Sequence, residues 1–352
     1  MRDIYLILEN NTVFKGKSFG AYKEAVGEVV FTTSMVGYVE ALTDPNYYGQ
    51  IIVQTFPQIG NYGVMDEDKN GEKIYASAYV VREKCDFPSN FRCEGTLESF
   101  LEKEGIPGIY GIDTRKLTKI IREEGVMNGK ISFTADFDED ITKYKIVDAV
   151  KSVAGNSETE IKAENEKKKV VLFDFGSKTP IIKELLKRDL SVTVVPANTT
   201  AKRIKEINPD GIVLSDGPGN PAENVDIIEN LKEVLSLNIP MFGISLGHQL
   251  LAMAQGAEVE KLKYGHRGSS QPVFSKETGR VFVTSQNHDY FVKSETLPSD
   301  AEVIYINKND NSCEGIQYKS FPAFSVQFSP EIGGDLPDSK LTYDKFVKLM
   351  EV

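Results

Sequence analysis

The sequence predicts a two-domain α/β protein. We expect a mixed, β-rich α/β domain first, followed by an open, mostly parallel sheet with helices on both faces. Three observations predict this arrangement. The 352 residues suffice for two domains of ordinary size. A polar stretch at 155–169, GNSETEIKAENEKKK, indicates a linker between 1–154 and 170–352. Beyond it, short apolar runs alternate with amphipathic segments, which is typical of a parallel sheet.

The N-terminal domain is expected to combine strands with at least one clear helix. Strand-like runs lie among glycines and turn residues at 3–8, 28–33 and 50–56. The segment 115–125, RKLTKIIREEG, places its apolar residues on one helical face. Either Asp113 or Thr114 could cap this helix.

The C-terminal domain alternates between strands and helices. Strands are expected at 170–173, 191–195, 211–214 and 240–244. Helices are expected at 180–188, 200–207, 223–237 and 247–254. Sites in such sheets lie at the carboxyl ends of the strands. The loop SDGPGNP at 215–221 and Ser245 both occupy that position.

The composition of the chain limits the binding partners and the cellular location that we expect. The formal net charge of −11 and the pI near 5.0 argue against nucleic acid and anionic membranes as partners. The start, MRDIYLILENNTVFKGK, has no long apolar run, so we expect neither a signal peptide nor a membrane span. The scattered cysteines Cys85, Cys93 and Cys313 favour reduced thiols in the cytoplasm over a metal site.

The stretch GISLGHQLLA at 243–252 contains G-x-S-x-G, the nucleophile-elbow pattern of serine hydrolases. A serine nucleophile needs a base, usually a histidine held by a carboxylate. The chain has only His248, His266 and His288. His248 lies one helical turn from Ser245 and should point away from its exposed side. No histidine follows His288, so a serine hydrolase would depend on His288 or on an unusual base.

The same stretch resembles a different elbow. GISLGHQLLAMAQGA is similar to the elbow of class I glutamine amidotransferases, in which cysteine is the nucleophile. LSDGPGNP resembles the loop of that family that supplies N–H groups to the oxyanion, and FSVQFSPE at 324–331 resembles the stretch that completes its Cys-His-Glu triad. Residues 27–63, 88–92 and 111–131 are similar to the small subunit of carbamoyl-phosphate synthase. The resemblance implies the class I amidotransferase fold for the C-terminal domain.

The resemblance breaks down at the catalytic positions. Ser245 stands where the family has cysteine, Ser329 stands where it has histidine, and only Glu331 is kept. A hydroxyl is far less acidic than a thiol, whose pKa is about 8.5. Loss of the nucleophile or the base costs on the order of 10⁶ in turnover in a serine protease. We therefore expect glutamine hydrolysis to be absent or very low, and Glu331, without its imidazole, to lie at the surface or an interface.

The resemblance also implies which residues would hold glutamine as a ligand: Ser34, Gly217, Gly219, Leu246, Gln249, Asn287, Asp289 and Tyr290. Several of them would act through their backbone groups and tolerate sequence change. Asp289 stands where the family usually has glycine. Its carboxylate would repel the carboxylate of the substrate, and aspartate resists some backbone conformations that glycine allows.

The family resemblance implies a partner, the large subunit, which binds ATP, its metal and bicarbonate in a heterodimer that makes carbamoyl phosphate for pyrimidine or arginine biosynthesis. This chain has no Walker A motif, so we expect no cofactor or metal of its own. An ammonia-dependent branch of the family also carries serine at the nucleophile position, which is compatible with a working synthetase. Two alternatives stay open: a regulatory protein that binds glutamine without hydrolysing it, and an active glutaminase subunit whose active-site residues were replaced to trap a ligand.

Overall fold

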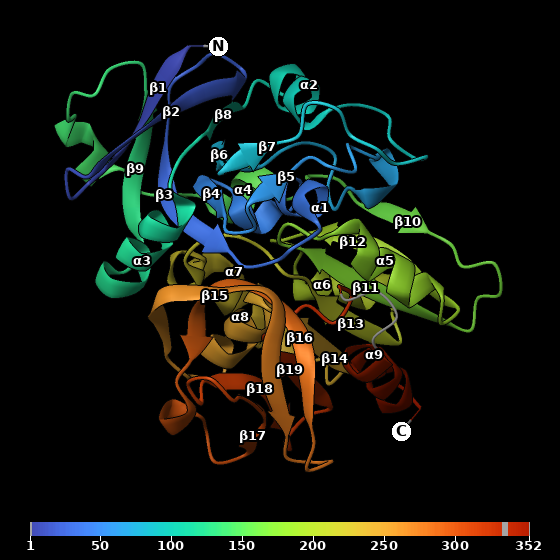
Figure 1. The fold of residues 1–352 in the computed structure, drawn as a ribbon. Helices are drawn as coiled ribbons and strands as arrows, with labels where there is room; N and C mark the ends of the chain where they lie inside the picture. The colour runs from blue at the N-terminus through green and yellow to red at the C-terminus, as the bar shows by residue number, and fades with distance from the viewer. Residues whose placement is uncertain (1, 333–336, 352) are drawn as a thin grey trace. The chain divides into compact units, whose positions relative to one another are not determined.

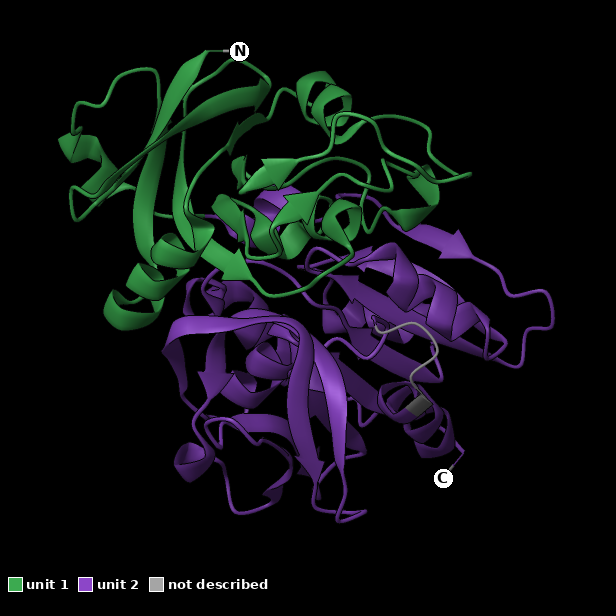
Figure 2. Ribbon diagram, viewed as in Figure 1, with its two compact units in different colours: residues 1–147 green, residues 148–352 purple. Residues whose placement is uncertain are grey.

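The structure, a computed structural model, describes residues 2–332 and 337–351 and divides into unit 1, residues 1–147, and unit 2, residues 148–352 (Figure 2). The boundary between the units therefore lies a few residues before the segment 155–169 that we expected to be a linker. This segment is part of unit 2, and within it Thr159–Ile161 form strand β10 at the edge of a sheet. The side chains of this edge strand are largely exposed, so the strand does not need apolar residues. The polar composition of the segment therefore did not indicate a strand.

Unit 1 is built on a closed barrel with strand order β1-β2-β8-β6-β4-β3-β9 (Figure 1). Its strands are β1 (Asp3–Leu8), β2 (Val13–Gly20), β3 (Ala25–Thr32), β4 (Gln50–Gln54), β6 (Ala78–Val80), β8 (Pro107–Tyr110) and β9 (Met127–Ser132). A separate pair is formed by β5 (Gln58–Ile59) and β7 (Glu83–Lys84). The helices are α1 (Tyr38–Leu42), α2 (Leu97–Lys103), α3 (Thr114–Glu124) and the 3₁₀ turns η1 (Pro45–Tyr47), η2 (Asp66–Asp68) and η3 (Glu139–Lys143).

Helix α3 corresponds to the predicted 115–125 segment. The carboxylate of Asp113 accepts a hydrogen bond from the backbone N–H of Lys116 at 2.9 Å. Asp113, rather than Thr114, is therefore the N-cap. Leu117 and Ile121 are buried, so the predicted apolar face packs against the barrel unit.

Unit 2 contains a ten-stranded sheet with order β10-β12-β11-β13-β14-β19-β18-β17-β15-β16. Its strands after β10 are β11 (Lys168–Asp174), β12 (Leu190–Pro196), β13 (Gly211–Leu214), β14 (Met241–Ile244), β15 (Val259–Ser275), β16 (Val281–Val292), β17 (Ala301–Asn307), β18 (Cys313–Tyr318) and β19 (Ala323–Val326). The pairs from β12 to β19 run parallel, as predicted. Beyond β19 the sheet continues antiparallel through β16.

Helices cover both faces of the parallel part, which confirms the predicted fold class. The helices are α4 (Ala149–Val153), α5 (Thr179–Leu186), α6 (Ala201–Ile207), α7 (Val225–Leu235), α8 (Leu246–Ala254) and α9 (Pro337–Leu349), with η4 (Pro221–Glu223) and η5 (Ser294–Thr296) as 3₁₀ turns. Along β11, Val171 and Phe173 pack in the core with α6, α7 and α8, whereas Val170 and Leu172 pack with α5 and α9. Successive side chains of a strand point to opposite faces of the sheet, and here each face packs in a core. The parallel strands are therefore apolar at every position rather than at every second one.

No helix within residues 2–332 and 337–351 is both long enough and apolar enough to cross a bilayer.

Candidate active site

Ser245 lies in a tight turn between a strand and a helix. Strand β14 ends at Ile244 and α8 begins at Leu246, and Ser245 between them has φ 49° and ψ −104°. Residues other than glycine rarely adopt a positive φ. Those that do cluster at functional sites. Gly247 makes the turn feasible, because a Cβ there would overlap the carbonyl of Leu214. The backbone is therefore that of a nucleophile elbow.

The glycine loop after β13 lies beside this elbow. Strand β13 neighbours β14, and the N–H of Gly247 donates to the carbonyl of Ser215 at 3.0 Å. A Cβ at Gly217 would overlap the carbonyl of Phe175 and approach Leu246, and Gly219 has φ 87°. Close approach and a positive φ thus require glycine at both positions. The loop and the first turn of α8 lie where backbone N–H groups of an oxyanion site are expected.

Ser329 is placed at the same edge of the sheet by strand β19. Strands β14 and β19 are parallel neighbours, with Ile244 paired to Val326. The N–H of Ser329 donates to the carbonyl of Ser285 at 2.9 Å, and both Ser245 and Ser329 are 3 % exposed. In the described part of the chain, no hydrogen bond joins the Ser245 hydroxyl to a histidine or a carboxylate. Among these residues the Ser245 hydroxyl thus lacks the hydrogen bond to a base that activates a serine nucleophile.

Glu331 belongs to a buried ionic cluster. The Lys178 ammonium lies 2.7 Å from an oxygen of Asp216 and 3.8 Å from an oxygen of Glu331, and all three side chains are 0 % exposed. Of the two locations that we expected for Glu331, the surface is therefore wrong, and the interface stays a prediction. Lys178 comes after β11, Asp216 after β13 and Glu331 after β19, so the cluster spans the carboxyl edge of the sheet. Such a cluster places a cation next to the carboxylate that would otherwise orient an imidazole.

Asp289 forms an ion pair with Arg267. The guanidinium donates from Nη2 to the Asp289 carboxylate at 2.5 Å and from Nη1 to the carbonyl of Tyr264 at 3.1 Å. The Arg267 side chain is 1 % exposed. Asp289 lies within β16 and is not among the residues with positive φ, so the backbone conflict that we expected does not arise. Its negative charge is also neutralised by Arg267, which weakens the expected repulsion of a substrate carboxylate.

The remaining residues of the expected glutamine site divide between the units. Ser34 belongs to unit 1, where its carbonyl accepts a hydrogen bond from the Gln54 amide at 2.5 Å. In unit 2, the Gln249 amide donates to the carbonyl of Tyr290 at 2.7 Å and to Gln327 at 3.0 Å. This contact ties α8 to the strand that carries Asn287, Asp289 and Tyr290.

None of the three histidines serves as a base for Ser245. His248 is buried, contacts the Ser325 hydroxyl at 2.8 Å, and has its pKa lowered by burial to about 3. The ring nitrogens of His288 contact the Tyr290 carbonyl and the Gln286 amide oxygen, and burial lowers its pKa well below the usual value. For His266, burial lowers the pKa but the carboxylates of Asp310 and Glu314 outweigh burial and raise it to about 9.

His266, His288 and Glu314 have ligand atoms within 4.8 Å of one another, as a metal site would require. Their polar atoms are already engaged, however. His266 Nε2 lies 2.8 Å from Asp310, and Glu314 accepts hydrogen bonds from the amides of Gln286 and Asn307. We interpret the group as a buried polar network between β15, β16 and β18.

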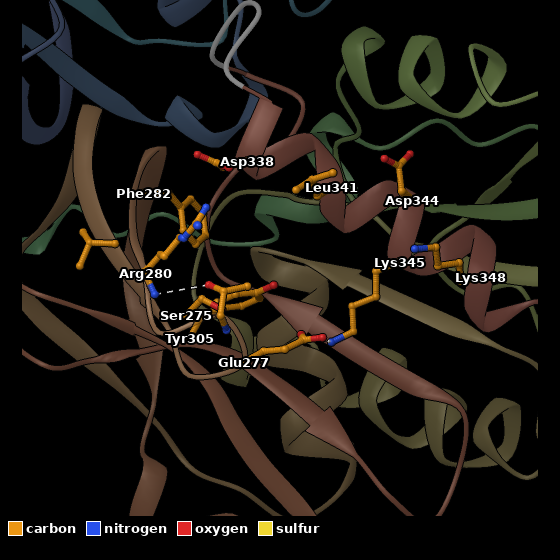
Figure 3. Close-up of a pocket in the computed structure, with 12 residues that line it drawn as sticks. Ser275, Glu277, Arg280, Phe282, Tyr305, Asp338, Leu341, Asp344, Lys345 and Lys348 are labelled. Carbon is orange, nitrogen blue, oxygen red and sulfur yellow. Dashed lines mark hydrogen bonds and ion pairs between the residues drawn. The ribbon is translucent and has the colours of Figure 1, made fainter.

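A separate cavity of about 440 Å³ lies at the other end of the β15–β16 ribbon (Figure 3). Phe282, Tyr305 and Leu341 contribute apolar surface, and Lys345 pairs with Glu277 at 3.4 Å. Val281, at this end, is eight residues from Asp289, or about 26 Å along an extended strand. The cavity is therefore not the elbow site.

Sequence reasoning missed Lys178, Asp216 and Arg267. The signal available for Lys178 was a lysine shortly after a buried strand, in DFGSK, and Asp216 lies two residues after β13, the neighbouring strand. Arg267 gave no such signal, because its partner lies 22 residues away across a β-ribbon.

Both units are similar to known proteins. A family model described as carbamoyl-phosphate synthase small chain, CPSase domain, matches residues 6–131, and one described as glutamine amidotransferase class-I matches residues 171–349. The carbamoyl phosphate synthase small chain of Clostridium perfringens is 46 % identical over 97 % of this chain and 98 % of its own. That of Archaeoglobus fulgidus is 45 % identical over 98 % of both. Among solved structures, a glutamine amidotransferase from Thermotoga maritima has 19 % identity and a TM-score of 0.40, covering 51 % of this chain and 84 % of that one.

Proposed function

Since the chain belongs to the carbamoyl-phosphate synthase small-chain family, we propose that it is a small subunit that has lost its own glutaminase step. In this role it binds the large chain and supports synthesis of carbamoyl phosphate from bicarbonate, ATP and free ammonia. ATP and its metal belong to the large chain. The cysteines Cys85, Cys93 and Cys313 are free, in keeping with the cytoplasmic location that we propose.

One observation carries this proposal: the elbow is intact, but no base among residues 2–332 and 337–351 hydrogen-bonds to Ser245. Ser245 keeps the strained backbone of a nucleophile, whereas Ser329 offers a hydroxyl at the position of the family's imidazole. A hydroxyl cannot accept a proton near neutral pH or return one to departing ammonia. The remaining triad member, Glu331, is engaged by Lys178. Catalysis by attack on the glutamine amide is therefore not supported.

The test compares two nitrogen donors on the purified complex of this chain with the large chain of its own organism. Carbamoyl phosphate formation is measured with ammonium chloride and with glutamine. We expect synthesis with ammonium and none above background with glutamine, and no glutamate release by the chain alone. Glutamine-dependent turnover near one per second would overturn the loss of the glutaminase. A chain that does not bind the large chain would overturn the subunit role.

A second candidate function is glutamine binding without hydrolysis, as a regulatory signal. The contact between Arg267 and Asp289 favours it, because the carboxylate that would repel the ligand is neutralised. Isothermal titration with glutamine tests it on the chain alone. A micromolar dissociation constant without the large chain would support a sensor, and no heat at millimolar glutamine would exclude one.

A further inference from the structure

The ribbon cavity, the space of about 440 Å³ at the tip of the β15–β16 ribbon, is bounded by three elements (Figure 3). Residues 275–282 of the ribbon form one side, α9 forms another, and β17 contributes Tyr305. Ligand sites in proteins are typically cavities of about 300–1,000 Å³ that combine apolar walls with a few polar groups. The ribbon cavity has this size, and it takes no part in the chemistry proposed for the elbow.

Helix α9 turns one face toward the cavity. Its lining residues recur at spacings that place them on one side of the helix: Asp338, Leu341, Asp344, Lys345 and Lys348. The other side is anchored in the core of unit 2, where Tyr343 and Phe346 are 0 % exposed and both contact the ring of Phe242. This wall of the cavity is therefore fixed by packing.

The turn that carries Arg280 is held by backbone hydrogen bonds. The N–H of Ser275 donates to the carbonyl of Arg280 at 2.9 Å, and the N–H of Lys276 donates to the carbonyl of Ile304 at 2.9 Å. The first bond closes the turn, and the second ties it to β17. Because this backbone is already ordered, little conformational entropy is lost when a ligand binds.

Two aromatic rings line the cavity. Phe282 and Tyr305 pack edge to face, with ring centroids 5.8 Å apart and an interplanar angle of 83°. Both rings also pack edge to face on Phe328, which is 0 % exposed. Phe282 is only half-buried, so part of its ring is open to the cavity. A flat apolar group of a ligand can pack on that ring as aromatic pairs do.

Tyr305 also brings a hydrogen-bond donor to the cavity. The residue is 8 % exposed, and within residues 2–332 and 337–351 its hydroxyl has no hydrogen-bond partner. Burial, the main cause, and the nearby carboxylate of Glu277 raise the pKa of Tyr305 to about 12, so the phenol stays protonated at neutral pH. An enclosed donor without a partner is costly, and an acceptor atom of a ligand would remove that cost.

Three of the six charged residues that line the cavity are already paired. The Lys345 ammonium lies 3.4 Å from the Glu277 carboxylate, and the Arg188 guanidinium donates to Asp344 at 2.7 Å. Both carboxylates therefore have a cation beside them, which weakens their repulsion of an anionic ligand.

The other three charged lining residues are Arg280, Lys348 and Asp338, and none of them forms an ion pair with a residue that the structure describes. Their charges sum to +1, which matches a ligand with one negative charge. A guanidinium binds a carboxylate through two parallel N–H bonds, so Arg280 suits that group better than Lys348 does. A dianion would exceed the available charge, and a neutral ligand would make no use of the guanidinium.

We propose that the ribbon cavity binds a small aromatic carboxylate, whose carboxylate contacts Arg280 and the Tyr305 hydroxyl and whose ring packs on Phe282. The site is independent of the proposed function, because it lies outside the elbow and requires no large chain. The three residues supply different parts of the recognition: a cation, an aromatic surface and an O–H donor. Removing each part in turn therefore separates their contributions.

Titration of the full chain with phenylacetate, followed by ligand-observed NMR, tests the site. We expect a dissociation constant of about 1 mM or below, which is ordinary for a ligand of this size. Phenylacetamide keeps the ring but has no charge, and acetate keeps the charge but has no ring. Each should bind at least about tenfold more weakly than phenylacetate.

Variants of the lining residues locate the ligand. Arg280→Gln should bind phenylacetate about tenfold more weakly, and Tyr305→Phe, which keeps the ring, about fivefold more weakly. Lys276→Gln is the matched control, because Lys276 is an exposed cation of the same turn but is not among the lining residues, and it should bind like the wild type. All three variants should unfold at the wild-type temperature, because none removes a packing or hydrogen-bonding contact of the core.

Equal affinity of Arg280→Gln and the wild type would overturn the proposed position of the carboxylate. An equal loss in Lys276→Gln and Arg280→Gln would also overturn it, because only the net charge of the turn would then matter. If phenylacetamide binds as tightly as phenylacetate, the ligand class is wrong. No binding to the wild type at tenfold above the expected dissociation constant would overturn the site as a whole, and each of these results leaves the subunit role untouched.

Discussion

Ser245 has a strained backbone, and no histidine or carboxylate in the described part of the chain hydrogen-bonds to its hydroxyl. Ser245 has φ 49° and ψ −104°, which lies outside the backbone regions favoured for L-residues. Holding a residue in such a conformation costs about 1–3 kcal/mol. In a working enzyme this strain exposes the nucleophile. Here the strain persists because the neighbouring strands and glycines fix the turn; a Cβ on Gly243, for example, would lie 3.0 Å from the carbonyl oxygen of Gly247.

Ser245→Gly should therefore stabilise the chain. Glycine adopts positive φ freely, and the relief of strain exceeds the ~0.5–1 kcal/mol of additional unfolded-state entropy. We expect the free energy of unfolding, from urea denaturation, to rise by about 1 kcal/mol. Ser245→Ala is the matched control and should give no gain, because alanine keeps the strain. A Ser245→Gly variant less stable than Ser245→Ala by about 0.5–1 kcal/mol would show that the turn is not strained, because only the entropy cost of glycine would then remain.

The ion pair of Arg267 and Asp289 leads to a second residue-scale prediction. Asp289→Gly would restore the residue usual in the family, but it would leave the guanidinium of Arg267 buried without this carboxylate. Removing one partner of a buried pair costs about 3 kcal/mol or more. We expect a loss of that size in the free energy of unfolding, and a much smaller loss in R267L/D289G. A double-mutant cycle with no coupling between the two positions would contradict this.

At the scale of elements, the alternation of strands and helices from 170 to 254 was predictable, because each element carries its own apolar period. Predicted 211–214 and 240–244 coincide with β13 and nearly with β14. The barrel of unit 1 and the ribbon of β15 and β16 were not predicted, because closure and register depend on residues far apart in the chain. Likewise, motifs identified Ser245 and Ser329, but the buried partners Lys178 and Arg267 exist only through tertiary contacts.

The contact between β15 and the turn after β17 should make stability depend on pH. In the folded chain, Asp310 and Glu314 raise the pKa of His266 to about 9, from 6.5 when unfolded. A raised pKa gives stability that is fully present below pH 6.5 and lost as pH rises through 9. We expect wild-type unfolding free energy to fall by about 3 kcal/mol over this range because of His266.

His266→Gln provides the comparison for this prediction, since it keeps a polar side chain but cannot titrate. Urea denaturation of both proteins at pH 6, 7, 8 and 9 isolates the contribution of the histidine. The wild type should lose its advantage over the variant as the pH rises. If the two curves stay parallel, the pKa of His266 does not differ between the folded and unfolded chain.

At the scale of the whole molecule, Ser245, Ser329 and Glu331 all belong to unit 2. Ser245 and Ser329 follow β14 and β19, which are parallel neighbours, so the backbone brings both positions to the same edge of the sheet. Restoring a nucleophile and a base at these two positions should therefore restore glutamine use by the complex.

The variant S245C/S329H, bound to the large chain, should release glutamate and make carbamoyl phosphate from glutamine. The thiolate forms readily only when an imidazole takes its proton, and the same imidazole protonates the departing ammonia. Cysteine alone is only a few per cent ionised at neutral pH, and histidine alone faces a weak nucleophile. Groups that act as a unit are non-additive, so the double variant should exceed the product of the single effects by orders of magnitude. If S245C alone hydrolyses glutamine as fast as the double variant, another residue is the base, and the assignment of Ser329 to the lost imidazole is wrong.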